Sequence, residues 1–94
     1  MIALAGHTYE DNTACIICRH VMDGAPVLQF VFDIDGEVQF LCGAARHDKR
    51  DARVVGLDEV DHRQNGLDSL PDMPLGTQAS RMSTKGRWEV TPLD

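Results

Sequence analysis

The stretch PVLQFVFDIDGEVQFLCG, from Pro26 to Gly43, has the alternating apolar pattern of a β-hairpin. Asp35-Gly36 lies midway along it and is a common turn signal. A three-residue loop with Gly36 in the left-handed conformation gives a wholly apolar face, whereas a two-residue loop mixes polar and apolar side chains. We therefore predict the loop Ile34-Asp35-Gly36 and one buried face that contains the pairs Phe32–Val38, Phe30–Phe40 and Leu28–Cys42.

Three other segments have the composition of short strands. TACII (Thr13 to Ile17) precedes the hairpin, ARVVGL (Ala52 to Leu57) follows it, and RWEV (Arg87 to Val90) lies near the end of the chain. The last segment would bring Trp88, the single tryptophan, onto the sheet or onto the extended segment before it.

One short helix is predicted after ARVVGL. Asp58 can cap its first turn, Asp61 can face back toward the cap, and Asn65-Gly66 can end it. The segment SLPDMPLG (Ser69 to Gly76) contains two prolines, so we expect extended chain there. The sequence thus predicts a single α+β domain over residues 1–94, with an antiparallel sheet, a central β-hairpin and one short helix.

The net charge of the chain indicates which kinds of partner it can attract. Fifteen acidic residues against nine basic ones give a formal net charge of −6, which disfavours binding to nucleic acid. The run RHDKRDAR (Arg46 to Arg53) has four basic residues but is interrupted by two aspartates, so we interpret it as a solvated loop. An acidic surface suits a basic protein partner.

The sequence also indicates in which compartment of the cell the protein is expected. The opening MIALAG is too short for a signal-peptide core, and no apolar run approaches the ~20 residues that span a bilayer. Three cysteines cannot all pair within one chain. We expect a cytoplasmic protein without a membrane partner.

The stretch CIICRH (Cys15 to His20) contains a C-x2-C pair, the spacing from which structural zinc often takes two of its four ligands. A hairpin returns its end to its start, so Cys42 should come back near this pair. Cys42 and His47 form a C-x4-H pair. We predict a Zn²⁺ site made of Cys15, Cys18, Cys42 and His47, with His20 as the competing fourth ligand.

Two other interpretations of these residues stay open. All three cysteines can be small buried side chains of the core. Alternatively, Cys15 and Cys18 can form a thiol–disulfide redox pair, which usually lies at the start of a helix and needs a lowered thiol pKa. Gly24 and Pro26 soon after the pair argue against such a helix. The chain has no nucleophile or phosphate-binding motif, so we expect no enzymatic activity.

Five stretches of the chain are considered together: RHVMDGAPVLQFVFD, DGEVQFLCG, RVVGLDEV, LDSLPDMPLGTQASR and the late RWEV. They run from about Cys15 to Val90, in the expected order, and together they resemble a small bacterial family of unknown function that has been grouped with the immunity proteins of polymorphic toxin systems. Relatives commonly carry a tryptophan where this chain has Val38.

The resemblance implies a small α+β module that binds another protein, and the family has no established catalytic residues to carry over. The cysteines are not general features of that family, so a metal site would belong to a subgroup. The function expected from the sequence is therefore a non-enzymatic, immunity-protein-like binding module with a structural zinc site, and a thiol redox protein is the alternative.

Overall fold

The computed structural model describes residues 1–43, 52–61 and 67–93. They form a small α+β domain with a two-stranded hairpin, a six-stranded sheet and short helices. The large sheet contains β3 (Ala14–Cys18), β4 (Gln29–Phe32), β5 (Val38–Leu41), β6 (Ala52–Gly56), β7 (Thr77–Ser80) and β8 (Glu89–Pro92). The other elements are β1 (Ile2–Leu4), β2 (His7–Tyr9), α1 (Arg19–Met22), α2 (Leu57–Asp61) and the 3-10 turn η2 (Leu67–Ser69).

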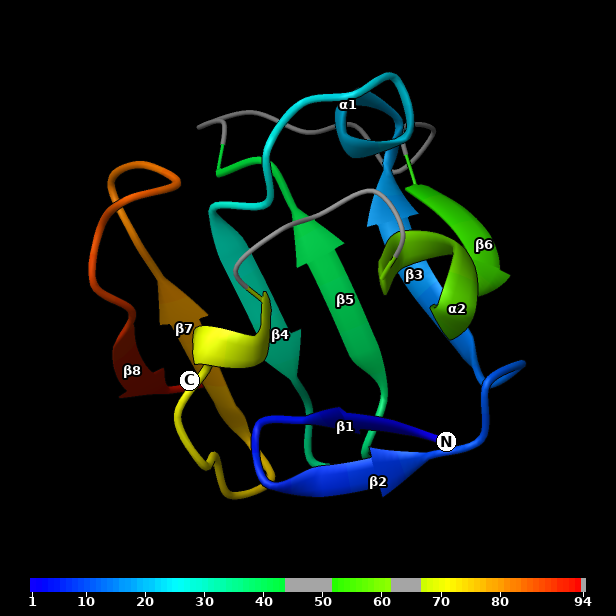
Figure 1. Cartoon of the computed structure of the whole chain (residues 1–94). Helices are drawn as coiled ribbons and strands as arrows, with labels where there is room; N and C mark the ends of the chain where they lie inside the picture. The colour runs from blue at the N-terminus through cyan, green and yellow to red at the C-terminus, as the bar shows by residue number, and fades with distance from the viewer. Residues whose placement is uncertain (44–51, 62–66, 94) are drawn as a thin grey trace.

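The strands of the large sheet lie in the order β6-β3-β5-β4-β7-β8 (Figure 1). Four of its five neighbouring pairs are antiparallel, and β3 with β5 is the parallel exception. The parallel pair arises because the chain leaves β3, makes α1 and adds β4 two positions away, before β5 fills the gap. The predicted α+β fold with an antiparallel sheet is confirmed, and β3 with β5 is a parallel pair within it that the sequence did not predict. The parallel pairing also places the C-terminal ends of β3 and β5 side by side, at the same end of the sheet.

The central hairpin has the predicted register. Phe30 pairs with Phe40, and Phe32 pairs with Val38. The loop contains Gly36 with φ of 85°, a conformation that favours glycine. The Asp33 carboxylate also closes the turn, because it accepts hydrogen bonds from the backbone N–H groups of Asp35 and Glu37 at 2.9 and 3.0 Å. The three-residue loop is confirmed.

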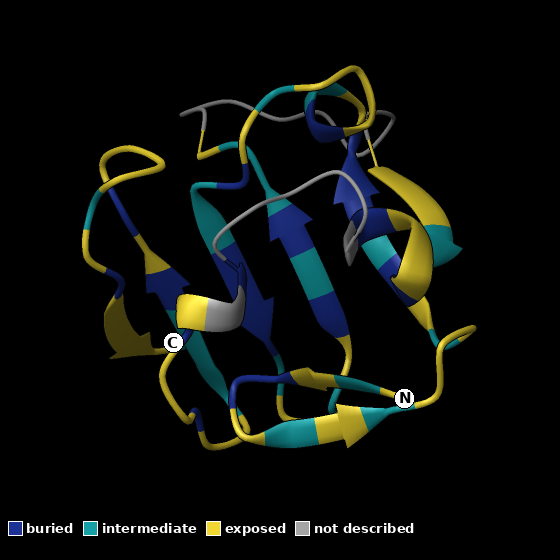
Figure 2. Cartoon of the chain, in the orientation of Figure 1, coloured by how far each residue is buried: buried dark blue, intermediate teal, exposed yellow. Residues whose placement is uncertain are grey.

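One face of the large sheet carries most of the core. In Figure 1, α2, η2 and the β1–β2 hairpin lie on the same side of this sheet, and Figure 2 shows that the central strands are its most buried part. Phe30 and Phe40 are fully buried there, with ring centroids 5.2 Å apart. Leu28 and Cys42 are only half-buried, because they lie where the predicted face reaches its end.

The predicted helix is present but begins earlier than expected. Helix α2 starts at Leu57, so Asp58 lies inside its first turn and does not cap it. The cap is supplied by Glu59, whose carboxylate accepts the Gly56 N–H at 3.1 Å. The side chain of Asp61 and the predicted end at Asn65-Gly66 lie outside the described residues.

The remaining predicted segments are found with shifted bounds. TACII corresponds to β3, ARVVGL to β6, and RWEV to the residues leading into β8. The segment Ser69–Gly76 is free of helix and strand from Leu70 to Pro74, as its prolines predict. Five elements were not anticipated: the two strands of the β1–β2 hairpin, α1, η2 and β7. Within the described ranges, no helix is long and apolar enough to cross a bilayer.

Candidate metal centre

The candidate centre begins where β3 passes into α1. Cys18 is both the last residue of β3 and the N-cap of α1, with extended backbone angles of −79° and 156°. One helical turn follows and places His20 beside the end of the strand. The turn stops at Gly24, whose φ of 109° reverses the chain, and the Ala25 N–H then donates to the His20 carbonyl at 2.9 Å.

Cys42 reaches the same place from the neighbouring strand. β3 and β5 run in parallel, with Ile16 beside Gln39 and Ile17 beside Phe40. Parallel neighbours end at the same edge of a sheet, so the residue after β5 arrives next to the residue that ends β3. The hairpin therefore does return Cys42 toward Cys18, as the sequence predicted.

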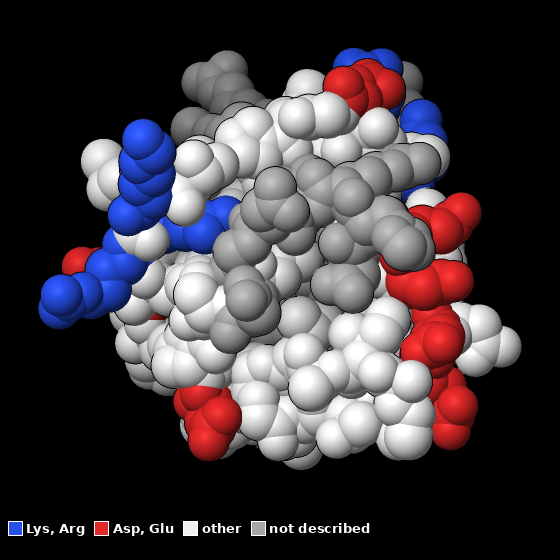
Figure 3. All heavy atoms as spheres, in the orientation of Figure 1, with Lys and Arg blue, Asp and Glu red and all other residues white. Residues whose placement is uncertain are grey.

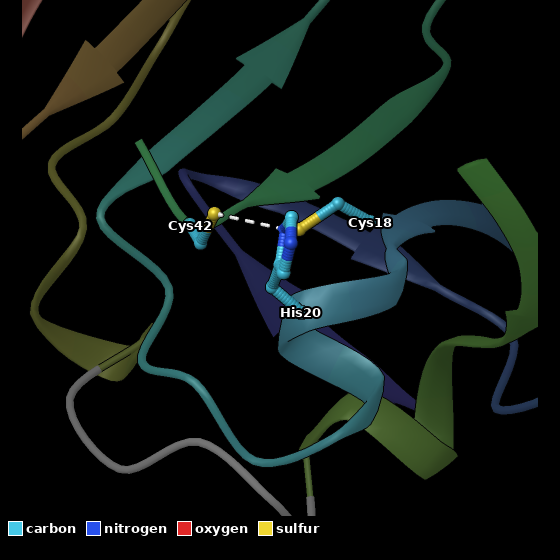
Figure 4. Close-up of side chains that lie close together, drawn as sticks. All are labelled: Cys18, His20 and Cys42. Atoms are coloured by element: carbon cyan, nitrogen blue, oxygen red, sulfur yellow. Dashed lines mark hydrogen bonds between the residues drawn. The ribbon is translucent and has the colours of Figure 1, made fainter. Parts of the chain in front are cut away.

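The donor atoms of Cys18, His20 and Cys42 lie within 4.8 Å of one another. Figure 4 shows the three side chains converging from β3, α1 and the end of β5. His20 Nδ1 lies 3.7 Å from Cys42 Sγ, in hydrogen-bond contact. Cys18 is buried, with 2% of its surface exposed, while His20 and Cys42 are half-buried. The group therefore lies at the rim of the core.

Two thiolates and an imidazole are the donors that zinc prefers in structural sites. In a tetrahedral site with Zn–S bonds of about 2.3 Å and Zn–N bonds of about 2.0 Å, donor atoms are about 3.5 to 3.8 Å apart. The His20–Cys42 separation of 3.7 Å already has that value. The widest separation, at most 4.8 Å, needs to shorten by about 1 Å, which side-chain rotation can provide. The three residues can therefore hold a metal ion.

Cys15 does not belong to this group. It lies on β3, where successive side chains alternate between faces, so Cys15 and Cys18, three residues apart, point to opposite sides. Cys15 is 3% exposed and packs in the core. Burial, with smaller effects from the Glu59 and Asp58 carboxylates, raises the pKa of its thiol from 9.0 to about 11.

The position of Cys15 in an extended strand weakens two predictions, the zinc knuckle and the redox pair. A C-x2-C pair in a zinc knuckle needs a tight turn, and an extended strand does not provide one. A redox nucleophile needs a lowered thiol pKa, whereas that of Cys15 is raised. Within the parts of the chain that the structure describes, no cysteine is in a disulfide.

The structure describes only one of the two histidines that were predicted as candidate ligands. His20, the competing ligand in the sequence prediction, lies in the group, and His47 falls in the segment 44–51, outside the described residues. The sequence feature that pointed to His20 was its position two residues after Cys18. Helix α1 turns the chain there and places His20 next to Cys42. Helix α1 was not predicted from the sequence.

Charged side chains are unevenly distributed over the surface. Figure 3 shows acidic atoms along the side that carries β6 and α2, and basic atoms beside the loop between β7 and β8. We define the acidic surface as four exposed residues: Glu10, Asp11, Asp58 and Glu59. The Asp58 N–H donates to the Asp11 carbonyl at 3.0 Å, which holds the two segments together.

Comparisons of the chain with protein-family models, with curated proteins and with solved structures found no match.

Proposed function

We propose that this chain is a small, non-enzymatic protein-binding module whose fold is stabilised by one Zn²⁺ ion held by Cys18, His20 and Cys42. The observation that carries the metal site is the convergence of three donor atoms within 4.8 Å from three different elements. A metal bound there links the end of β3, the turn α1 and the end of the hairpin. A domain of 94 residues has a thin core and gains from such a link.

A fourth ligand completes a closed structural zinc site. We propose His47 for this position, on the C-x4-H spacing from Cys42 alone. Cys15 is left out of the set, because its side chain lies in the core and apart from the other three donors.

Elemental analysis of the full-length protein, purified without chelator and with zinc supplied, tests the site. We expect about one zinc per chain, lost in Cys18→Ser and in Cys42→Ser and retained in the matched variant Cys15→Ser. His47→Ala tests the fourth ligand separately. Less than about a tenth of an equivalent in the parent protein would contradict the metal site.

The binding role is supported by the sequence resemblance and by the surface charge. The acidic surface concentrates four carboxylates on one side of the molecule, although the terminal ammonium of Met1 pairs with Asp11 at 2.9 Å. A basic protein partner would be attracted there, and salt would weaken the attraction. In an immunity-like role, that partner would be a toxin.

Affinity capture with the zinc-loaded chain tests this role. We expect a protein partner to be retained from a lysate of the source organism at low salt and released at high salt. The double variant Asp58→Lys, Glu59→Lys should retain less of it, because both side chains are exposed and their reversal leaves the core intact. If the parent and the variant both retain no protein at low salt, the binding role is wrong.

A further inference from the structure

The two cysteines of the candidate metal centre are also close enough to react with each other. Their sulfur atoms lie within 4.8 Å, and a disulfide needs about 2.05 Å. A change of rotamer moves a cysteine sulfur by about 3 Å, which covers the difference.

The backbone positions fit the same bond. Extending the register Ile17–Phe40 by one residue places Cys18 beside Leu41, and Cys42 is the next residue along. With strands about 4.8 Å apart and about 3.3 Å per residue, the two Cα atoms are roughly 6 Å apart. Disulfides span roughly 4.4 to 6.8 Å between Cα atoms, so little backbone movement is needed.

The two thiols differ in their access to solvent. Cys42 is half-buried at the rim of the core, whereas Cys18 is 2% exposed. A reagent from solution therefore meets Cys42 first, and Cys18 lies behind it, protected from the reagent but within reach of Cys42. Cys15, buried elsewhere in the core, does not belong to the group.

From this arrangement we propose that Cys42 is a modification site for small-molecule disulfides and that Cys18 resolves the adduct into a reversible Cys18–Cys42 disulfide. In the first step, the Cys42 thiolate attacks one sulfur of the small disulfide, a mixed disulfide forms, and one small thiolate leaves. In the second step, the Cys18 thiolate attacks Cys42 Sγ, the protein disulfide forms, and the second small thiolate leaves. The two protein thiols are oxidised, the small disulfide is reduced, and the two protons end on the two small thiols.

Oxidation and metal binding then exclude each other, because both use the same two sulfur atoms. This competition rests on the proposed zinc site, whereas the disulfide itself does not. The centre would act as a redox-sensitive metal site, in which an oxidising small disulfide releases the ion.

Incubation of the metal-free, full-length protein with oxidised glutathione tests the disulfide. Trypsin cleavage after Arg19 and Arg46 gives one peptide with both Cys15 and Cys18 and another with Cys42. The test therefore uses Cys15→Ser, in which a link between the two peptides joins Cys18 to Cys42. We expect this link, with loss of both thiols to alkylation, and we expect Cys18→Ser to stop at a glutathione adduct on Cys42.

A second arm adds zinc. With zinc at about ten times its dissociation constant, only about a tenth of the molecules have unbound thiolates, so oxidation should slow about tenfold. Complete oxidation of the zinc-loaded protein should release its zinc to a colorimetric chelator.

Three outcomes separate the proposals. If Cys15→Ser accumulates only glutathione adducts, or keeps both thiols reduced, the disulfide proposal is wrong, whatever the zinc content. If the link forms but no zinc binds, the disulfide stands and the zinc site fails. If zinc binds and the link forms at the same rate with and without it, the two do not compete and the switch is overturned.

Discussion

The guanidinium carbon of Arg81 lies 4.2 Å from the centroid of the Trp88 ring, so the cation stacks on the indole. Arg81 is 7% exposed, and its Nε and Nη2 atoms both donate to the Val27 carbonyl, at 3.1 and 2.9 Å. The indole Nε1 donates to Ser69 Oγ at 3.2 Å. These contacts fasten the loop between β7 and β8 to the chain that enters β4 and to the last residue of η2.

Replacing Arg81 by methionine should therefore destabilise the domain. The change keeps an apolar stem but removes the cation and leaves the Val27 carbonyl without this donor. We expect a loss of about 2 to 4 kcal/mol in the free energy of unfolding. Urea denaturation measures it, and Arg87→Met, at an exposed position of the same loop, should change stability by less than about 0.5 kcal/mol. Equal stability of the two variants would contradict this role of Arg81.

Trp88 gives an independent optical test of the same packing. The side chain is 8% exposed and lies against the core. Its fluorescence in the native protein should be blue-shifted and should move to the red on unfolding. A native spectrum like that of free tryptophan in water would show that the ring is solvated.

The Phe30–Phe40 pair at the centre of the hairpin should dominate the stability of the sheet. Both side chains are fully buried, and alanine at either position leaves a cavity. We expect a cost of about 3 to 5 kcal/mol for Phe30→Ala or Phe40→Ala. The matched control is Ile34→Ala in the hairpin loop, where the side chain is 71% exposed and the cost should be below about 0.5 kcal/mol. If the control lost as much stability in urea as Phe30→Ala, the assignment of the buried face would be wrong.

The hairpin could be predicted because several independent features of its sequence agree. Alternation, a turn dipeptide and the need for an apolar face all select the same register. The missed elements lack that support. The strands β1 and β2 have three residues each, too few to show a period, and β7 has the sequence TQAS, with Ala79 as its one buried residue. The place of β7 depends on pairing with β4, which is distant in the sequence, and such pairing is not encoded in the local sequence.

Only part of the candidate metal centre could be predicted from the sequence. The same residues were assigned both a strand and a zinc knuckle, although alternation in a strand separates Cys15 from Cys18. His20 was ranked after His47 because His47 forms a C-x4-H pair with Cys42. Gly24 and Pro26 argued against a helix after Cys18, so α1, which places His20 in the group, was not expected. Helix α1 needs only one turn, and it ends before Gly24. The topological part of the prediction, that the hairpin returns Cys42 to Cys18, is confirmed.

The Cys15 thiol predicts a loss of stability at alkaline pH. Its pKa is raised from 9.0 to about 11, so the folded protein keeps this proton to higher pH than the unfolded chain. The stabilisation is complete below pH 9 and disappears as the pH rises toward about 11, an effect of about 2 kcal/mol. Urea denaturation of the parent and of Cys15→Ala measures it.

The stability difference between these two proteins should shrink by that amount from about pH 8 to about pH 11. Other groups titrate equally in both proteins and cancel in the difference. A constant difference over this range would show that the thiol ionises as readily in the folded protein as in the unfolded chain.

Removal of the metal should lower the melting temperature of the parent protein. A ligand that binds only the folded state at about 100 times its dissociation constant adds about 2.7 kcal/mol to stability. For a domain of this size, each kcal/mol shifts the melting temperature by roughly 4 to 8 °C, so excess zinc should raise it by about 10 to 20 °C over chelated protein. Cys15→Ser should keep this shift, because its side chain lies outside the group of Cys18, His20 and Cys42. Cys42→Ser should lose it. An equal shift in Cys42→Ser would place the zinc at a different set of ligands.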